Sequence, residues 1–586
     1  MALKRKVAAG LLAAVPALAG CDAEATTEPG LEVAVHSLLG GLEPGETYAL
    51  SGEDARKLLL TGGDDGAEYL IVPFYGIRDE TSELALEILG NGVGATPAPT
   101  LARAPERAGT PLRALGAIGA RAARSGPGLA ATVAGADRAH QRLRSRMRAE
   151  AADLMRRGFS HLPNRAALLS ARREDESFAP AAVGDLLEFN TQADSACTAP
   201  RYRTGRVMAI SDRAIVVADT LNPENGFTTA DYEGFADEFD ALIHPVVSGT
   251  FGEPSDIDGN GKVIIFFTSA VNELTPPGSE GVVAGFFYGR DLFPRVGTER
   301  FEGCAGSNEA EIFYMLVPDP ERAQTEPIFS REEVAFLTMG TIAHEYQHLI
   351  NAARRMYVNG ASAFEDGWLD EALSHVAEEL TFYEASGMGP GQDIDLGALV
   401  ASERRVDAAN RYLVPNLVRY GLFLQEVEQT SIFEFDLQGR GASWSFLRYA
   451  ADRSGMSDEE FFGRLANATT AGITNLGNVA GADVFDLARD WTISIYADNL
   501  VPGLDARFRQ PSWDFRSILP ELFPAVGFPL TFRTFGSDRS ENLALKGGGT
   551  AFLTVTVDAA TRASLETSTT GGALPNGFKL SVLRVK

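Results

Sequence analysis

The pentapeptide His-Glu-Tyr-Gln-His at residues 344–348 constrains what this chain can fold into more than any other feature. On an α-helix, His344 and His348 lie one turn apart on the same face, so both imidazoles can reach one metal ion. Glu345 then follows the first histidine, where its carboxylate can take a proton from a water at the metal. Because the chain has only seven histidines, this spacing would arise by chance in about one of a few hundred such chains. The motif therefore predicts a metal centre on a helix, against the alternative of two surface histidines.

The residues around the motif predict that it is helical. Ser330, with Glu333 three residues later, forms a capping-box pattern that places a helix start just before Arg331. Apolar residues then recur through the motif as far as Ile350. We expect the chain to be mainly helical from Ser330 to about Asn499.

A catalytic zinc ion needs a third protein ligand and one open position. Asn351 and Arg354 stand where a metzincin carries glycine and histidine, which excludes that class. Downstream, Trp-Leu-Asp-Glu-Ala-Leu-Ser-His at 368–375 resembles the second-helix motif of gluzincin peptidases. This resemblance makes Glu371 the third ligand. The alternatives for Glu371 are a solvated helix carboxylate and a partner of the helix dipole.

Three neighbours of Glu371 are candidates for supporting roles. Asp370 and His375 are the remaining candidates for a ligand, and Ser374 and His375 share the helix face of Glu371. We expect Asp370, Ser374 and His375 to hold the metal ligands in place. A purely structural histidine is an equal alternative for His375.

Taken together, the two motifs resemble the hyicolysin-like family of bacterial secreted neutral metallopeptidases, and the resemblance covers roughly 180–500. It includes the segment at 256–267 and the segments that begin at Gly285 and Ser307. It implies an α+β, gluzincin-like catalytic domain with a mixed β-sheet and a helical half. Asp370 stands where the family pattern has asparagine, a departure that leaves the adjacent ligand in place.

The same resemblance implies the chemistry. His344, His348 and Glu371 would bind one Zn²⁺, and Glu345 would be the general base that activates water for hydrolysis of a protein or peptide substrate. A binding lipoprotein with a decayed site is one rival hypothesis, and the intact Glu345 argues against it. A metal-dependent hydrolase of a non-peptide substrate is the other. Tyr412, Tyr420 and Tyr449 are candidate donors to the oxyanion, and a segment at 439–442 could approach the site, although a loop before a core helix fits it better.

The first twenty residues have the composition of an export signal. Three basic residues at 4–6 precede an apolar run at 7–18, and small residues lead into Cys21. This arrangement resembles the bacterial lipobox, which implies that Cys21 is lipidated and anchors an exported protein at the cell envelope or surface. An ordinary cleaved signal peptide is the alternative. Later stretches are too short or too polar to span a bilayer, so the lipid would be the membrane attachment.

Cys197 and Cys304 remain as a pair in an exported protein, which favours a disulfide over two buried thiols. The 52 basic and 79 acidic residues give a formal net charge of −27, which argues against nucleic acid as a partner. We expect a monomer.

Asp256, Asp258 and Asn260, followed by Gly261, copy the first half of a calcium loop. Phe267 stands at the twelfth place, where an EF-hand carries glutamate, so a full EF-hand is rejected. A partial Ca²⁺ turn and a plain hairpin turn remain as alternatives.

Composition and patterning divide the chain into a catalytic domain flanked by small all-β modules. The helix expected at about 138–157 could be a spacer or part of an inhibitory pro-segment. The expected divisions are a signal peptide at 1–20, a tether at 21–30, an N-terminal β module at 31–90, an Ala/Arg/Pro-rich linker with a helix at 91–178, the metallopeptidase domain at 179–500, a connector at 501–528 and a C-terminal sandwich-like module at 529–586.

Overall fold

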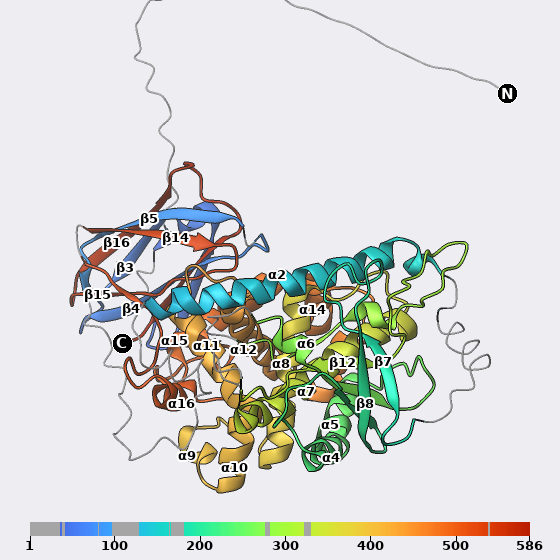
Figure 1. Ribbon diagram of the computed structural model, residues 1–586. Coiled ribbons are helices and arrows are strands. Elements are labelled where there is room, and N and C mark those ends of the chain that lie inside the picture. Colours follow the sequence, from blue (N-terminus) through green and yellow to red (C-terminus); the bar gives the residue numbers. More distant parts are fainter. Residues whose placement is uncertain are drawn as a thin grey trace, which may run out of the picture.

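The computed structural model describes residues 36–37, 41–79, 81–95, 128–162, 165, 181–275, 282–321, 330–536 and 539–586. Within these ranges the fold is α+β, with three β-sheets and a large helical half (Figure 1). The signal peptide, the tether and Cys21 lie outside the described residues. Within the described ranges, no helix has both the length and the apolar character needed to cross a bilayer.

Strands from both ends of the chain form one two-sheet β-domain, where the sequence analysis expects two separate modules. One sheet has the order β1-β3-β16-β5-β14 and the other β13-β15-β4-β17-β2, with β6 paired to β15. β5 (Glu83–Asn91) lies between β14 and β16, and β4 (Ala67–Tyr75) lies between β15 and β17. Buried and exposed residues alternate strictly along β5, so one of its faces must be covered by a second sheet. Neither the N-terminal nor the C-terminal segment has enough strands to cover its own apolar face, so the strands of both segments form the domain together.

The other strands of this domain are short. They are β1 (His36–Ser37), β2 (Thr47–Ser51), β3 (Lys57–Thr61), β6 (Gly94–Ala95), β13 (Arg533–Thr534), β14 (Arg539–Lys546), β15 (Leu553–Val557), β16 (Arg562–Thr569) and β17 (Phe578–Arg584).

A six-stranded mixed sheet with the order β11-β12-β10-β9-β8-β7 supports the helix that carries the motif. β10 (Val263–Phe267) is buried throughout and runs parallel to both of its neighbours, as expected for a strand covered on both faces. β11 (Gly285–Phe287) closes the edge in the antiparallel direction. A Cβ at Gly285 would lie 2.8 Å from Thr341 Cγ2, so glycine lets this edge strand approach the motif helix closely. The remaining strands are β7 (Leu186–Asn190), β8 (Tyr202–Ile210), β9 (Ala214–Asp219) and β12 (Ile312–Met315).

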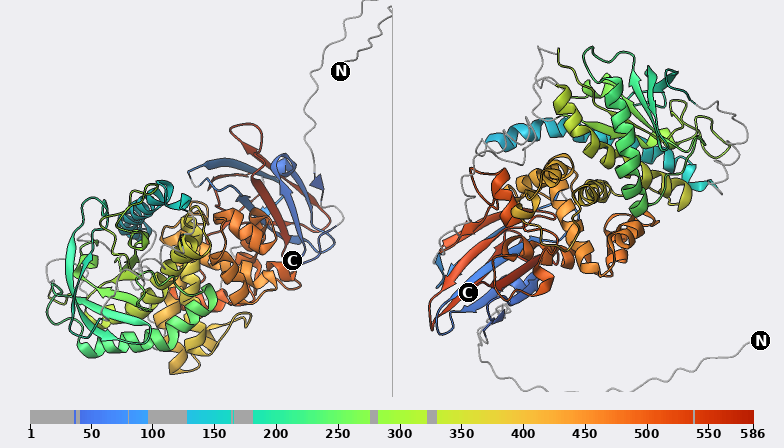
Figure 2. Two further views of the ribbon diagram at one scale, coloured as in Figure 1. Left: turned by 90° about the vertical axis from the view of Figure 1, so that its right-hand side faces the viewer. Right: turned by 90° about the horizontal axis from the view of Figure 1, so that it is seen from below.

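The helical half lies between the six-stranded sheet and the β-domain (Figure 2). α7 (Arg331–Ala353) carries the motif and packs against α8 (Gly367–Ser386). Before the motif helix, α4 (Thr229–Glu238) is extended by a π-helical turn at Phe239–Ile243. Besides α7 and α8, the α-helices that follow α4 in the described residues are α5 (His244–Phe251), α6 (Ser269–Asn272), α9 (Leu396–Leu399), α10 (Glu403–Ala408), α11 (Val414–Gln425), α12 (Leu437–Ser454), α13 (Asp458–Ala466), α14 (Gly472–Ala480), α15 (Val484–Ala497) and α16 (Phe515–Leu522).

A long helix, α2 (Gly128–Arg156), crosses the front of the helical half in Figure 1. It is longer than the helix expected at 138–157. Its buried apolar residues recur at helical spacing and pack into the cores around the six-stranded sheet and around the C-terminal end of α7: Leu143, Met147, Ala151, Leu154 and Met155. The C-terminal half of α2 is therefore docked on the region that carries the motif.

Candidate metal centre

The helix that carries the motif begins where the sequence predicts. Ser330 is the N-cap of α7: its side chain accepts a hydrogen bond from Glu333 N, and the Glu333 carboxylate accepts one from Ser330 N. His344, Glu345 and His348 lie deep in α7 and are buried. The mainly helical character expected up to about Asn499 is also confirmed.

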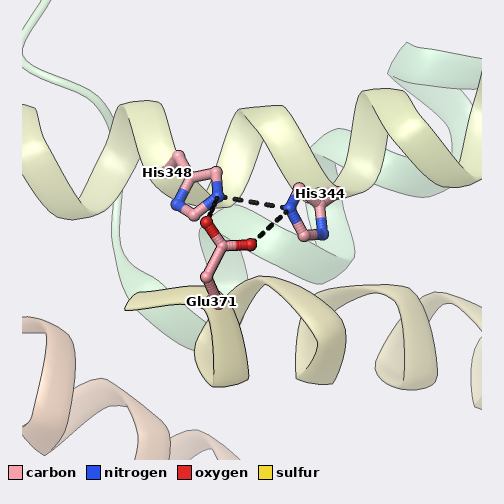
Figure 3. Close-up of side chains that lie close together, drawn as sticks. All are labelled: His344, His348 and Glu371. Atoms are coloured by element: carbon pink, nitrogen blue, oxygen red, sulfur yellow. Dashed lines mark hydrogen bonds and ion pairs between the residues drawn. The ribbon is translucent and has the colours of Figure 1, made fainter. Parts of the chain in front are cut away.

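His344 and His348 from α7 meet Glu371 from α8 (Figure 3). The two Nε2 atoms are 3.2 Å apart. Glu371 Oε2 lies 3.5 Å from His344 Nε2, and Glu371 Oε1 lies 3.6 Å from His348 Nε2. Ligand atoms at about 2.0–2.1 Å from a tetrahedral zinc ion stand about 3.4 Å from one another. Each of the three separations is thus close to the value that such an ion requires, with the two contacts of Glu371 made by different oxygens.

The state of Glu371 supports the same fit. Its carboxylate is fully buried, and Oε2 receives no hydrogen bond from any described residue. Burial by itself raises the pKa of Glu371, but Arg144 and then His348 hold that pKa well below its usual range. A buried anion with an unused oxygen, beside two imidazole nitrogens, is the donor set that Zn²⁺ prefers.

The outer nitrogen of each histidine is held by carboxylates. His348 Nδ1 lies 3.0 Å from Asp370 Oδ2 and 3.0 Å from Ser374 Oγ. The Ser374 hydroxyl donates to Gln347 Oε1 at 2.6 Å, so towards His348 it acts as an acceptor. These bonds fix the ring and direct His348 Nε2 towards the metal. Asp370 and Ser374 therefore lie where a supporting role requires them.

Glu378 holds the outer nitrogen of His344, a role that the sequence motifs do not indicate. Its Oε1 lies 2.7 Å from His344 Nδ1 and 3.0 Å from His375 Nδ1. Burial raises the pKa of Glu378, but His375 and His344 outweigh burial and keep that pKa far below its ordinary value. The signal that could have found Glu378 is its spacing of seven residues from Glu371, two turns along the same face of α8.

His375 contacts the same oxygen of Glu378 as His344 does. Burial holds the pKa of His375 well below its ordinary value. Its ring centre is 4.6 Å from that of His344, and its Nε2 has no hydrogen-bond partner among the described residues. His375 is thus linked to His344 through Glu378.

Glu345 is close to the three donors and is held from two sides. Its Oε2 accepts a hydrogen bond from Phe287 N of the edge strand β11 at 2.8 Å. Its Oε1 accepts one from Arg144 Nη2 of α2 at 3.2 Å. A cavity of about 310 Å³ opens beside Glu345 and His348, and Arg144, Met147 and Arg148 of α2 form part of its wall. Arg144 is the second residue that the sequence analysis misses.

The tyrosines expected as oxyanion donors have their side chains committed elsewhere. Tyr412 Oη donates to Glu238 Oε1 at 2.5 Å, and Tyr449 Oη donates to the carbonyl of Arg507. Tyr420 packs among aromatic rings in the core. The segment at 439–442 is part of α12, and its Arg440 brings Nη1 to 3.7 Å from Glu371 Oε2.

The acidic turn after α5 is closed by its own hydrogen bonds. Asp256 Oδ1 accepts from Gly261 N at 2.8 Å, and Asp258 accepts from the backbone and the side chain of Asn260. Glu311 is buried beneath the turn and accepts from Ile257 N at 2.9 Å. These contacts are those of a hydrogen-bonded turn, and they carry no evidence for Ca²⁺.

Cys197 and Cys304 are joined in a disulfide between residues 107 positions apart. The bridge ties the loop after β7 to the loop before β12. The disulfide lies next to the C-terminal part of α2, where Cys197 N donates a hydrogen bond to Glu150 Oε1 at 3.1 Å.

Comparison with known proteins supports a metallopeptidase. The chain is 29% identical over 217 residues to the neutral metalloprotease ShpI of Staphylococcus hyicus. The match covers 36% of this chain and 43% of that protein, less than half of its length. No protein-family model matches the chain. The similarity and the buried His-His-Glu cluster together support a bacterial metalloprotease that binds a metal ion, without assigning the chain to the hyicolysin-like family.

Proposed function

We propose that this protein is a zinc endopeptidase of the gluzincin type. The observation that carries the proposal is the cluster of His344 Nε2, His348 Nε2 and the Glu371 carboxylate, in which the two nitrogens are 3.2 Å apart and each lies 3.5 to 3.6 Å from a different oxygen of Glu371. A zinc ion bound by these three residues would supply Lewis acidity, which lowers the pKa of water. The partial similarity to a neutral metalloprotease supports peptide bonds as the target.

The residues around the proposed zinc site then have defined roles. Glu345 takes a proton from the attacking water and delivers it to the leaving amine. Phe287 N fixes one oxygen of this carboxylate, and the other oxygen, which accepts from Arg144 in the structure, would have to reach the water. Glu378 holds His344, while Asp370 and Ser374 hold His348. The cavity beside Glu345 offers room for the peptide next to the cleaved bond.

Casein hydrolysis by the purified chain tests this proposal. Glu345→Gln should bind one zinc ion and lose at least about a hundredfold in hydrolysis, because general acid–base catalysis contributes roughly that much. Glu332→Gln, an exposed acid in the first turn of the same helix, is the matched control and should keep full activity. Zinc bound without hydrolysis of casein by the wild type would point to a non-peptide substrate or a binding protein. Equal activity of Glu345→Gln and wild type would refute the assigned base.

The third ligand is tested by zinc content. Glu371→Ala should lose the bound zinc at neutral pH. Asp370→Ala should still take up one equivalent at saturating zinc, with an affinity about 10- to 100-fold lower, since Asp370 contacts His348 Nδ1. If Asp370→Ala lost its zinc and Glu371→Ala kept it, Asp370 would be the third ligand and Glu371 the supporting residue.

We propose further that the chain is an exported monomer held at the bacterial cell envelope through lipid on Cys21. The signal-like residues 1–20 support export, and the disulfide between Cys197 and Cys304 suits an oxidising compartment. Growth of the expressing cells with labelled palmitate should label the wild type and not Cys21→Ser. Absence of label from the wild type would favour an ordinary cleaved signal.

A further inference from the structure

We propose that α2 is a built-in inhibitory helix whose Arg144 closes the metal centre. This inference rests on the proposed zinc peptidase function. It concerns α2 (Gly128–Arg156), which follows the N-terminal strands and precedes the catalytic sheet in the sequence.

The guanidinium of Arg144 contacts the atoms that the reaction needs. Nη1 donates to Glu371 Oε1 and lies 3.4 Å from His348 Nε2. Nη2 donates to Glu345 Oε1 at 3.2 Å. The side chain is only 10% exposed. One buried cation thus bridges the proposed base and two of the three proposed ligands.

These contacts oppose catalysis in two ways. Each oxygen of Glu345 already accepts a hydrogen bond, one from Phe287 N and the other from Arg144, so a water at the metal would compete with Arg144 for the base. A guanidinium next to His348 Nε2 and Glu371 Oε1 also competes with a divalent cation for the same donors, because two positive charges at this distance repel strongly in a buried site. An oxyanion donor would instead leave the base free and point an N–H group into the cavity.

Further contacts along α2 hold Arg144 in this position. Arg148 Nη2 donates to Asp370 Oδ2 at 2.6 Å and to Glu371 Oε1 at 3.1 Å. Glu150 accepts from Cys197 N and from Tyr288 Oη. Two arginines of one helix therefore neutralise the acidic residues around the metal centre, and the glutamate anchors the next turn.

The opposite face of the helix points to solvent. Arg146 is 60% exposed and pairs with Asp194 on the surface. The apolar residues Met147 and Ala151 line the cavity beside Glu345, where a substrate would lie. The inhibitory contacts thus come from the face of α2 that also forms one wall of this cavity.

The β-domain limits how this inhibition could be relieved. β4 and β5, from the segment before α2, lie inside sheets that the C-terminal strands complete. Removing all residues before α2 would break that domain. The structure therefore assigns inhibition to α2 itself and not to the strands that precede it.

Substitution at Arg144 in the full chain tests the proposal, with Arg146→Gln as the matched control on the exposed face of the same helix. Arg144→Gln should lower the zinc dissociation constant about tenfold, measured by competition with a chromophoric chelator, because it removes a competing charge-assisted hydrogen bond. It should also raise casein hydrolysis about tenfold or more. Arg146→Gln should match the wild type in both measurements. Arg148→Gln should change zinc affinity and hydrolysis in the same direction as Arg144→Gln, but by less. It replaces Arg144→Gln as the test if that variant does not fold.

Two results would overturn the inference. If Arg144→Gln and Arg146→Gln had equal zinc affinity and equal hydrolysis, α2 would be a structural element without an inhibitory role. Lower hydrolysis in Arg144→Gln than in Arg146→Gln would make Arg144 part of the catalytic machinery. If all variants bind zinc and none cleaves casein, the proposed function fails, and the zinc dissociation constants still decide whether Arg144 competes with the metal.

Discussion

Replacing Glu378 with glutamine should weaken zinc binding without removing a ligand. In the folded protein the ionised carboxylate of Glu378 receives the hydrogen bond of His344 Nδ1 at 2.7 Å in a fully buried site. A hydrogen bond to a charged group contributes about 1.5–3 kcal/mol, and a neutral one about 0.5–1.5 kcal/mol. Glutamine keeps an acceptor oxygen and loses the charge, so the loss at His344 is about 1–1.5 kcal/mol. The zinc dissociation constant should therefore rise about tenfold.

The assay is a competitive zinc titration of the purified variants against a chromophoric chelator at neutral pH. Glu379→Gln is the control: Glu379 is the next residue of α8, also fully buried, but it accepts from Arg448 Nε at 2.9 Å and from Trp513 Nε1 at 2.6 Å. That variant should lower the melting temperature and leave the zinc dissociation constant unchanged. Equal zinc affinity in Glu378→Gln and wild type would refute the role of Glu378. An equal loss of affinity in both variants would show that general destabilisation of α8 explains the effect.

Three other predictions concern stability. Replacing Cys197 and Cys304 by alanine should lower the free energy of unfolding by up to about 5 kcal/mol in urea titrations, because the bridge closes a loop of 107 residues; an unchanged unfolding midpoint would contradict this. Burial, with Asp258 and Asp256 nearby, raises the pKa of Glu311 from 4.5 to about 8. The unfolded state releases this proton at lower pH, so the stability that Glu311 contributes is complete below pH 4.5 and is lost as the pH rises through about 8, by at most about 5 kcal/mol. Glu311→Gln should flatten the melting temperature between pH 5 and 9, and an equally steep decline in the variant would rule the carboxyl out as its source. Ser330→Ala should cost about 1 kcal/mol through loss of the α7 cap, and thermal melts with no shift would contradict it.

Local patterns predicted the centre of the site well. The start of α7 at Ser330 and the common face of His344 and His348 depend on residues three or four positions apart, and such relations can be read from the sequence. The position of Glu371 came from a motif resemblance, and the structure brings it to the histidines. These elements are local or carry a motif, which is why a single sequence suffices for them.

Long-range contacts could not be predicted in the same way. Nothing in the sequence of β4 or β5 specifies that its partners lie at the other end of the chain, since the pairing of strands depends on a complementary face and not on spacing. Arg144 looks like any other basic residue of an Arg-rich helix until the docking of α2 brings it to Glu345 and Glu371. Its role depends on tertiary packing alone.

The joint β-domain has a consequence for how the protein is made. Pro73 of β4 accepts a hydrogen bond from Thr550, 477 residues later in the chain, and β17 pairs beyond that point. At about 5–20 residues per second, roughly half a minute or more passes between synthesis of the first strands and of their partners. During that interval the apolar faces and open edges of β4 and β5 lack the strands that cover them, and they are exposed to pairing with other chains. Folding of the β-domain therefore depends on residues 578–584, and a chain that lacks β17 should aggregate through its first strands.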